Sequence, residues 1–282
     1  MISLAVISLA SLLYSVDSSL LTVPQNPKIS GGVNASLEDF PYMVSIRLKA
    51  LESSTGFGDG FFCQGVLTSP RSVLTSSDCV LNGSGPRTPE ELGLVLGTVS
   101  RTNASGAIAV EPEQIWINHD GRVAVIKLAR EVLYVRPVVL NEFQQDGGKQ
   151  CILMGWGANS TDGKPVETLQ EVYVRITKEK CPQNLICARA DKENAGICLW
   201  DTGVPLLCDG SLSGVYVGKP NHCGIEIEQF ASVRAHWDWI GAQIAAANGT
   251  NHRSAIWCLL IMSLLMTMQN VTLSTQYPTM NK

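Results

Sequence analysis

Hydrophobic residues occur through the middle of the chain in many short runs, which are separated by Gly, Pro, Asn and Asp. In one of them, Val172, Val174 and Ile176 share a face, with the period of two that is typical of a half-buried strand. Similar runs are Tyr42–Leu48, Gly65–Thr68, Ser72–Thr75, Val123–Leu128 and Leu212–Val217. Strands this short, at this spacing, predict an all-β barrel or sandwich.

One later segment has helical spacing instead. Val233, Trp237, Ile240 and Ile244 recur on one face if the segment is wound as an α-helix. The sequence therefore predicts a single amphipathic helix after the β-rich region.

The N-terminus begins with a mostly apolar run, Ile2–Leu13, followed by the short residues Val16-Asp17-Ser18. This order is typical of a secretory signal with its cleavage site, and we interpret residues 1–18 as a signal peptide. The alternative is that the run forms a buried strand or helix.

The tail 248–282 contains an apolar segment, 255–268, with no charged residue over 14 positions. A spanning helix needs roughly 20 residues. The small residues Asn248-Gly249-Thr250 precede the segment in an order that resembles a lipid-anchor signal, although the polar stretch 269–282 departs from that pattern. A cleaved anchor signal, a short membrane helix and a disordered tail are the three interpretations, and membrane association is favoured.

Composition narrows the function classes. The 282 residues are 45% hydrophobic and 16% charged, as in globular proteins, and a net charge of −4 without basic runs argues against a nucleic-acid partner. Nine cysteines indicate an oxidising compartment.

Six N-x-[ST] sequons support a secreted glycoprotein; they lie at Asn34, Asn82, Asn103, Asn159, Asn248 and Asn270. We expect no metal and no cofactor, because zinc spacing, a P-loop and GxGxxG are absent from the sequence.

Several motifs follow one another in the order of a known domain. They are Lys28–Gly32, Phe62–Pro70, Ser72–Cys79, Gly121–Leu128, Cys151–Gly157, Cys198–Cys208 and Trp237–Ile240. Together they resemble the trypsin/chymotrypsin-type (S1) serine proteases from Ile29 to about Ala247. The resemblance implies two six-stranded antiparallel β-barrels with a cleft between them and a C-terminal helix. Residues 19–28 would be a short propeptide ahead of a peptidase-like domain, 29–247.

The resemblance also implies how the cysteines pair, which spacing alone cannot decide. The implied bridges are Cys63–Cys79, Cys151–Cys208, Cys181–Cys187 and Cys198–Cys223. Cys258, in the apolar tail, is left over.

The three catalytic positions implied by the resemblance carry the wrong side chains. Such an enzyme needs a hydroxyl nucleophile, an imidazole base and an orienting carboxylate. Asp78 stands at the histidine position, Arg122 at the aspartate position and Thr202 at the serine position. An Asp carboxylate, with an ordinary pKa of about 3.9, is a poor base at neutral pH, and Arg cannot accept a proton. The four histidines lie outside these motifs, at His119, His222, His236 and His252.

The substrate-binding positions are altered too. Gly196, at the base of the specificity pocket, offers no acidic group, and Val217-Gly218-Lys219 replaces the strand along which substrates lie. Trp200 stands where the family has a glycine, and we expect its bulk to resist the backbone shape of the oxyanion site.

Two charged relationships are expected. Asp201 is the residue that, in this family, pairs with the new ammonium group after the activation cleavage. Cleavage after Lys28 would free Ile29 for that role, and otherwise Asp201 needs another partner. We also predict an Asp78–Arg122 ion pair in place of the lost His–Asp hydrogen bond.

These observations favour a secreted or surface-held, non-catalytic protease homologue. It would act by binding other proteins, such as active proteases or their substrates, as a regulator or decoy in a protease cascade. An active endopeptidase with Thr202 as nucleophile is the alternative, and a purely structural glycoprotein is a third interpretation.

Overall fold

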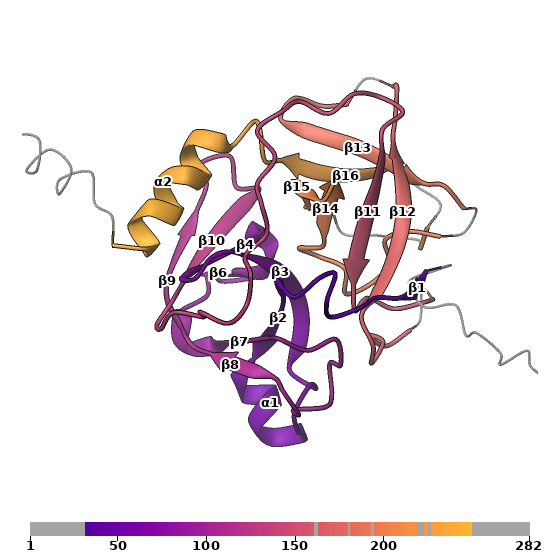
Figure 1. The fold of residues 1–282 in the computed structure, drawn as a ribbon. Helices are drawn as coiled ribbons and strands as arrows, with labels where there is room; N and C mark the ends of the chain where they lie inside the picture. Colours follow the sequence, from indigo (N-terminus) through magenta and orange to yellow (C-terminus); the bar gives the residue numbers. More distant parts are fainter. Residues whose placement is uncertain are drawn as a thin grey trace, which may run out of the picture.

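Two seven-stranded antiparallel sheets form the body of the molecule (Figure 1). The computed structural model describes residues 32–160, 163–179, 181–192, 195–218, 223–224 and 227–249. The predicted signal peptide and propeptide, the tail beyond Gly249, and Lys28, Ile29 and Lys219 lie outside these residues.

The first sheet has the strand order β8-β7-β2-β3-β4-β10-β9. Its strands are β2 (Met43–Leu48), β3 (Phe61–Ser69), β4 (Ser72–Ser76), β7 (Leu92–Leu96), β8 (Ile108–Val110), β9 (Pro112–Ile117) and β10 (Val123–Leu128). The short hairpin β5 (Leu81–Asn82) and β6 (Gly85–Pro86) extends from it, with the 3-10 turns η2 (Ser77–Cys79) and η3 (Pro89–Glu91) on either side. The curled sheet encloses Val44, Ile46, Val66, Leu74 and Val125, all fully buried.

The second sheet closes on itself because β12 pairs with β13 as well as with β11. Its strands are β1 (Val33–Asn34), β11 (Gln150–Gly155), β12 (Gln170–Ile176), β13 (Leu185–Ala190), β14 (Pro205–Cys208), β15 (Ser211–Tyr216) and β16 (Glu228–Ser232). Six of these strands form the closed barrel, and β1 adds to the outside of β12. The predicted alternation in β12 is confirmed: Val172, Val174 and Ile176 are buried, and Tyr173 and Arg175 are exposed. The all-β, trypsin-like fold is therefore confirmed, with one closed barrel and one curled sheet.

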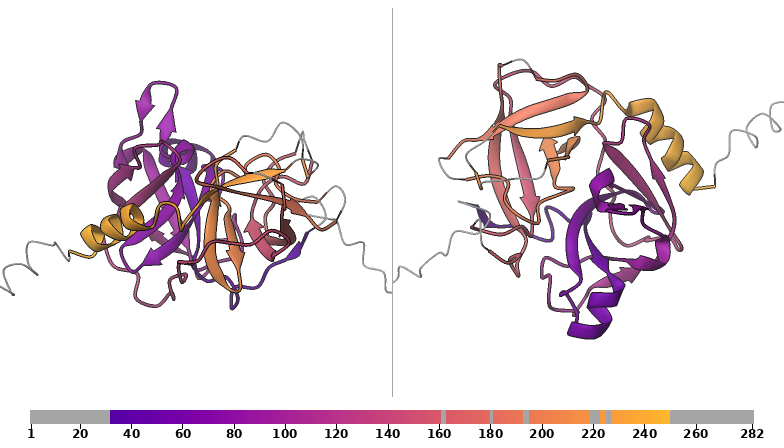
Figure 2. Two further views of the ribbon diagram at one scale, coloured as in Figure 1. Left: turned by 90° about the horizontal axis from the view of Figure 1, so that it is seen from above. Right: turned by 180° about the vertical axis from the view of Figure 1, so that it is seen from behind.

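The C-terminal helix α2 (Trp237–Ala247) leaves the second sheet and packs against β10 of the first (Figures 1 and 2). Ile240 and Ala247 are buried, and Trp237 and Ile244 pack against the same core. The predicted helix is thus confirmed. It ties the two sheets together.

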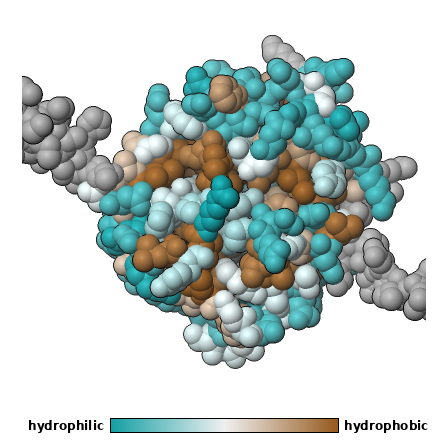
Figure 3. Space-filling view, viewed as in Figure 1, coloured by the Kyte–Doolittle hydropathy of each residue, from teal (hydrophilic) through white to brown (hydrophobic). Residues whose placement is uncertain are grey.

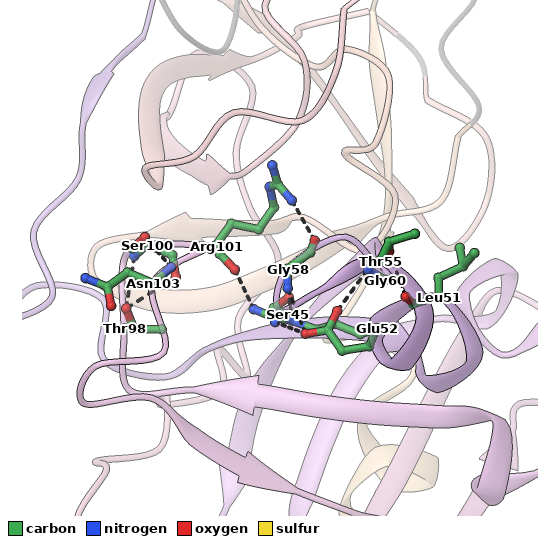
Figure 4. Close-up of polar contacts among 11 residues, drawn as sticks. Ser45, Leu51, Glu52, Thr55, Gly58, Gly60, Thr98, Ser100, Arg101 and Asn103 are labelled. Carbon is green, nitrogen blue, oxygen red and sulfur yellow. Dashed lines mark hydrogen bonds and ion pairs between the residues drawn. The ribbon is translucent and has the colours of Figure 1, made fainter.

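The sequence did not predict the helix α1 (Lys49–Thr55), which has no buried residue. Polar contacts hold the loop that follows it (Figure 4). The Glu52 carboxylate accepts the backbone N–H groups of Gly58 at 2.7 Å and Gly60 at 2.9 Å, and the Arg47 guanidinium at 2.5 Å. Arg47 also donates to the carbonyl of Arg101 at 2.8 Å. Hydrogen bonds rather than an apolar stripe stabilise this region. The pattern of hydrophobic residues therefore does not predict the helix α1.

All four implied disulfides are present: Cys63–Cys79, Cys151–Cys208, Cys181–Cys187 and Cys198–Cys223. Bridges of this number indicate an oxidising, extracellular-type environment. Of the helices that the structure describes, neither is long and apolar enough to cross a membrane, and segment 255–268 lies outside that part of the chain.

Candidate functional site

The backbone brings the three expected catalytic positions together between the sheets. Asp78 lies in η2 after β4, Arg122 directly precedes β10, and Thr202 lies before β14. The N–H of Ser77, beside Asp78, donates to the carbonyl of Arg122 at 3.0 Å. The carbonyl of Thr202 accepts the N–H of Gln64 at 3.1 Å and lies 3.7 Å from the sulfur of Cys79. Backbone contacts thus hold the segments that carry Asp78, Arg122 and Thr202 close to one another.

The side chains at these positions do not form a triad. Arg122 Nη1 donates to the carbonyl of Gln183 at 2.8 Å and lies 3.8 Å from Asp120 Oδ2. The predicted Asp78–Arg122 ion pair is therefore wrong: the long guanidinium side chain reaches acceptors outside the pair. Within the described residues, neither the Asp78 carboxylate nor the Thr202 hydroxyl has a hydrogen-bond or ion-pair partner.

Of the two histidines that the structure describes, the buried one is fully engaged elsewhere. His236 Nδ1 lies 2.7 Å from the Ser232 carbonyl, and Nε2 lies 2.8 Å from Asp120 Oδ2. Both ring nitrogens of His236 are therefore occupied by these contacts and are not available to the Thr202 hydroxyl. Burial raises the pKa of Asp120, but the hydrogen bond and charge of His236 and the nearby Arg122 hold it below its ordinary value. His119 is exposed.

Trp200, at the expected oxyanion position, has an unusual backbone conformation. Its φ is 72°, in the left-handed region that glycine adopts freely. This conformation costs of order 1–3 kcal/mol for a non-glycine residue. The indole is 40% exposed and donates to the Gly163 carbonyl at 3.3 Å. The effect of Trp200 on the oxyanion site stays a prediction.

Asp201 is fully buried and held by neutral donors. Its carboxylate accepts Gln64 Nε2 at 3.1 Å, the N–H of Gly157 at 3.0 Å and the N–H of Cys198 at 2.9 Å. Burial raises the pKa of Asp201 to about 7, against the opposing effect of these hydrogen bonds. A Cβ on Gly155 would lie 2.8 Å from the same carboxylate, so the Gly-Trp-Gly motif makes room for it.

Gln64 was missed by sequence reasoning. It is fully buried in β3, and its Oε1 also accepts the N–H of Trp156 at 3.0 Å. The available signal was an amide side chain inside an otherwise apolar strand, a position that requires hydrogen-bond partners in the core. Gln64 thus links the sheet that carries Asp78 to the loop that carries Thr202.

A buried acidic residue lies next to Gly196, the position expected at the base of the specificity pocket. Gly196 carries no side chain, but Glu228 of β16 is buried beside it, with Oε1 3.1 Å from the position of a Gly196 Cβ. The same oxygen accepts the N–H of Ile197 at 3.2 Å. Tyr216 packs edge-on against Phe230, with ring centroids 5.7 Å apart, and its hydroxyl lies over Gly218. Folding therefore brings the Glu228 carboxyl group beside Gly196.

The remaining expected positions are half-buried or exposed. Val217 is half-buried, and its N–H donates to the Gln229 carbonyl at 3.2 Å.

The sequon asparagines in the described part of the chain are all exposed; they are Asn34, Asn82, Asn103, Asn159 and Asn248. Their glycosylation stays a prediction. No cluster of His, Cys, Asp and Glu suited to a metal occurs among the described residues.

Comparisons with known proteins agree with this geometry. The sequence matches the Trypsin family over residues 29–240. It is 29% identical to serine protease SP24D of Anopheles gambiae, over 77% of this chain and 81% of that protein, and 26% identical to human azurocidin, over 75% and 85%. The structure of human heparin binding protein superposes with a TM-score of 0.65 at 25% identity, covering 76% of this chain and 95% of that one. The chain therefore belongs to the trypsin family of S1 serine proteases.

Proposed function

We propose that this protein is a secreted or surface-held, non-catalytic member of the trypsin family that acts by binding other proteins. One observation carries the proposal: the triad positions hold no imidazole base for the Thr202 hydroxyl. Arg122 is directed to Gln183 and Asp120, and Asp78 offers only a carboxylate. Without a base, a Thr hydroxyl is a weak nucleophile.

Other features support a binding role. The exposed indole of Trp200 places a large aromatic surface where the family has a glycine, and aromatic residues are enriched at the energetic centres of interfaces. One structural relative is named for binding heparin, which is a binding activity rather than a catalytic one. Four disulfides suit an extracellular protein, and segment 255–268 supports tethering to a membrane.

The alternative is an endopeptidase that uses Thr202. It is favoured by Thr202 itself, a hydroxyl-bearing residue that the fold places near Cys79 and Gln64 as the family resemblance implies. Among the described residues, this alternative lacks an imidazole base beside Thr202.

Active-site labelling separates the two. The full chain, expressed through a secretory pathway and cleaved after Lys28, is treated with a fluorophosphonate and mapped by mass spectrometry. We expect no adduct on Thr202, whereas Asp78→His, Arg122→Asp and Thr202→Ser combined supplies a matched, triad-bearing control. A Thr202 adduct that disappears in Thr202→Ala would contradict the proposal. Capture of active proteases or their substrates by the same protein would separate a regulator from a purely structural glycoprotein.

A further inference from the structure

A groove of about 510 Å³ lies away from the triad positions, where the chain enters the first sheet and crosses to the second. It is lined by residues 38–42, by residues 136–139 of the segment between β10 and β11, and by side chains of β11, β12 and β14. Its apolar lining consists of Phe40, Pro41, Pro137, Val138, Ile152 and Leu207. At its edge, Val139 is 55% exposed and Tyr173 is 53% exposed. The groove thus offers an apolar floor and two exposed apolar side chains.

Acidic side chains dominate the charge of this groove. Glu38, Asp39 and Glu171 line it, against one basic residue, Arg136. None of the four is in an ion pair with another described residue. Within the described part of the chain, no ion pair neutralises these carboxylates.

Burial and the negative charge together raise the pKa of titratable groups in the groove. Burial first, and the charge of Asp39 second, raise the pKa of the Glu171 carboxyl above its ordinary value. The same two causes raise the pKa of Tyr42 to about 12. A cation placed between Asp39 and Glu171 would relieve this repulsion.

The exposed apolar surface continues along the segment that joins the sheets. Leu133, Tyr134 and Phe143 are exposed there, Tyr134 by 97%. This segment crosses the face of the molecule drawn in Figure 1, and hydrophobic residues gather in the middle of that face in Figure 3. Exposed apolar surface beside a groove is typical of a protein-interaction site. Several neighbouring exposed apolar side chains are needed to form such a surface, because single ones are common on any protein.

We propose that this groove is a docking site for an extended segment of a partner protein, which places a Lys or Arg side chain between Asp39 and Glu171 and apolar side chains against Val139 and Tyr173. The long aliphatic stem of such a basic side chain suits the apolar floor, and its charged end suits the rim. The proposal extends the protein-binding role above but uses different residues. A domain that cleaved peptides at Thr202 could still bind through this groove, so the two proposals fail separately.

The test measures binding of a fluorescent, acetylated hexapeptide, Leu-Lys-Val-Leu-Arg-Val, to the full chain by fluorescence anisotropy. Two matched probes replace Lys and Arg by Gln or by Glu. We expect the basic probe to bind at least tenfold more tightly than the Gln probe, and Asp39→Asn with Glu171→Gln to weaken it at least tenfold. The control pair Glu90→Gln with Glu142→Gln, which changes the net charge equally at exposed positions outside the groove, should leave the affinity within twofold.

Three results would overturn the proposal: no binding of the basic probe at millimolar concentration, equal binding of the Glu probe, or equal loss in both pairs of variants. The chain's own N-terminal region is the competing occupant, since Lys28 is the one basic side chain in residues 1–31. Carbodiimide cross-linking of Lys28 to Asp39 or Glu171 within one chain would identify that occupant and also overturn the proposal.

Discussion

Gln64 Nε2 lies 3.1 Å from Asp201 Oδ1, in the buried region between the two sheets. Together with the N–H groups of Gly157 and Cys198, this amide satisfies the carboxylate with neutral donors. Among the described residues, three neutral donors hold the Asp201 carboxylate. Gln64 thus ties the residue next to Thr202 to strand β3.

Replacing Gln64 tests this relationship. Gln64→Leu removes a donor to Asp201 and an acceptor for Trp156 N–H while keeping a similar volume. Because both buried partners lose a hydrogen bond, we expect the free energy of unfolding to fall by about 2–4 kcal/mol in urea titrations. Gln144→Leu, at an exposed position, should change it by less than about 0.5 kcal/mol. Equal, small changes in both variants would show that Gln64 does not stabilise the site.

The raised pKa of Asp201 predicts how stability depends on pH. Folding raises this pKa from 3.8 to about 7, so its contribution to stability is fully present below about pH 4 and is lost as the pH rises through 7. The change is on the order of 4 kcal/mol. Asp201→Asn should remove this part of the slope in thermal unfolding between pH 4 and 7, whereas Asp146→Asn should retain it. An unchanged slope in Asp201→Asn would refute the assignment.

The His236–Asp120 pair supports the packing of α2 against β10. Asp120→Asn weakens the hydrogen bond to the buried His236 ring, and we expect about 1–2 kcal/mol of destabilisation at pH 7, moderated by the partial exposure of Asp120. Asp238→Asn, on the exposed face of α2, is the control. Urea unfolding of both variants measures the two changes in the free energy of unfolding. Comparable losses in Asp120→Asn and Asp238→Asn would show that the His236–Asp120 pair has no special role in stability.

Two sequons have geometry that favours modification. Asn82 and Asn103 are exposed, and each accepts the backbone N–H two residues on, at 2.8 and 2.9 Å, in a turn at the surface. We expect glycans at both positions in protein from a secretory host. Deglycosylation with mass spectrometry should show a loss at each site, absent in Asn82→Gln and Asn103→Gln respectively. Unmodified asparagines would argue against passage through that pathway.

Much of the fold was readable from the sequence because short apolar runs with turn residues between them leave few alternatives. The alternation in Val172–Ile176 and the helical stripe depend only on local periodicity. The alternation is confirmed, and the helix is confirmed from Trp237 onward, with Val233 lying before its start. The helix α1 was missed because Glu52 and its backbone donors, not apolar contacts, hold that region.

The site was less readable because side-chain direction is a tertiary property. The motifs located Asp78, Arg122 and Thr202, but the guanidinium of Arg122 follows acceptors at Gln183 and Asp120 that lie on other segments. Glu228 reaches Gly196 from β16, which is distant in the sequence, so only the folded chain brings these two residues together.

The most direct test of catalytic inactivity is the turnover number of the purified full chain, cleaved after Lys28, on a peptide library that includes basic residues before the scissile bond. We expect wild type and Thr202→Ala to give the same background rate, because no imidazole base activates the hydroxyl. Turnover by wild type that Thr202→Ala abolishes would contradict it.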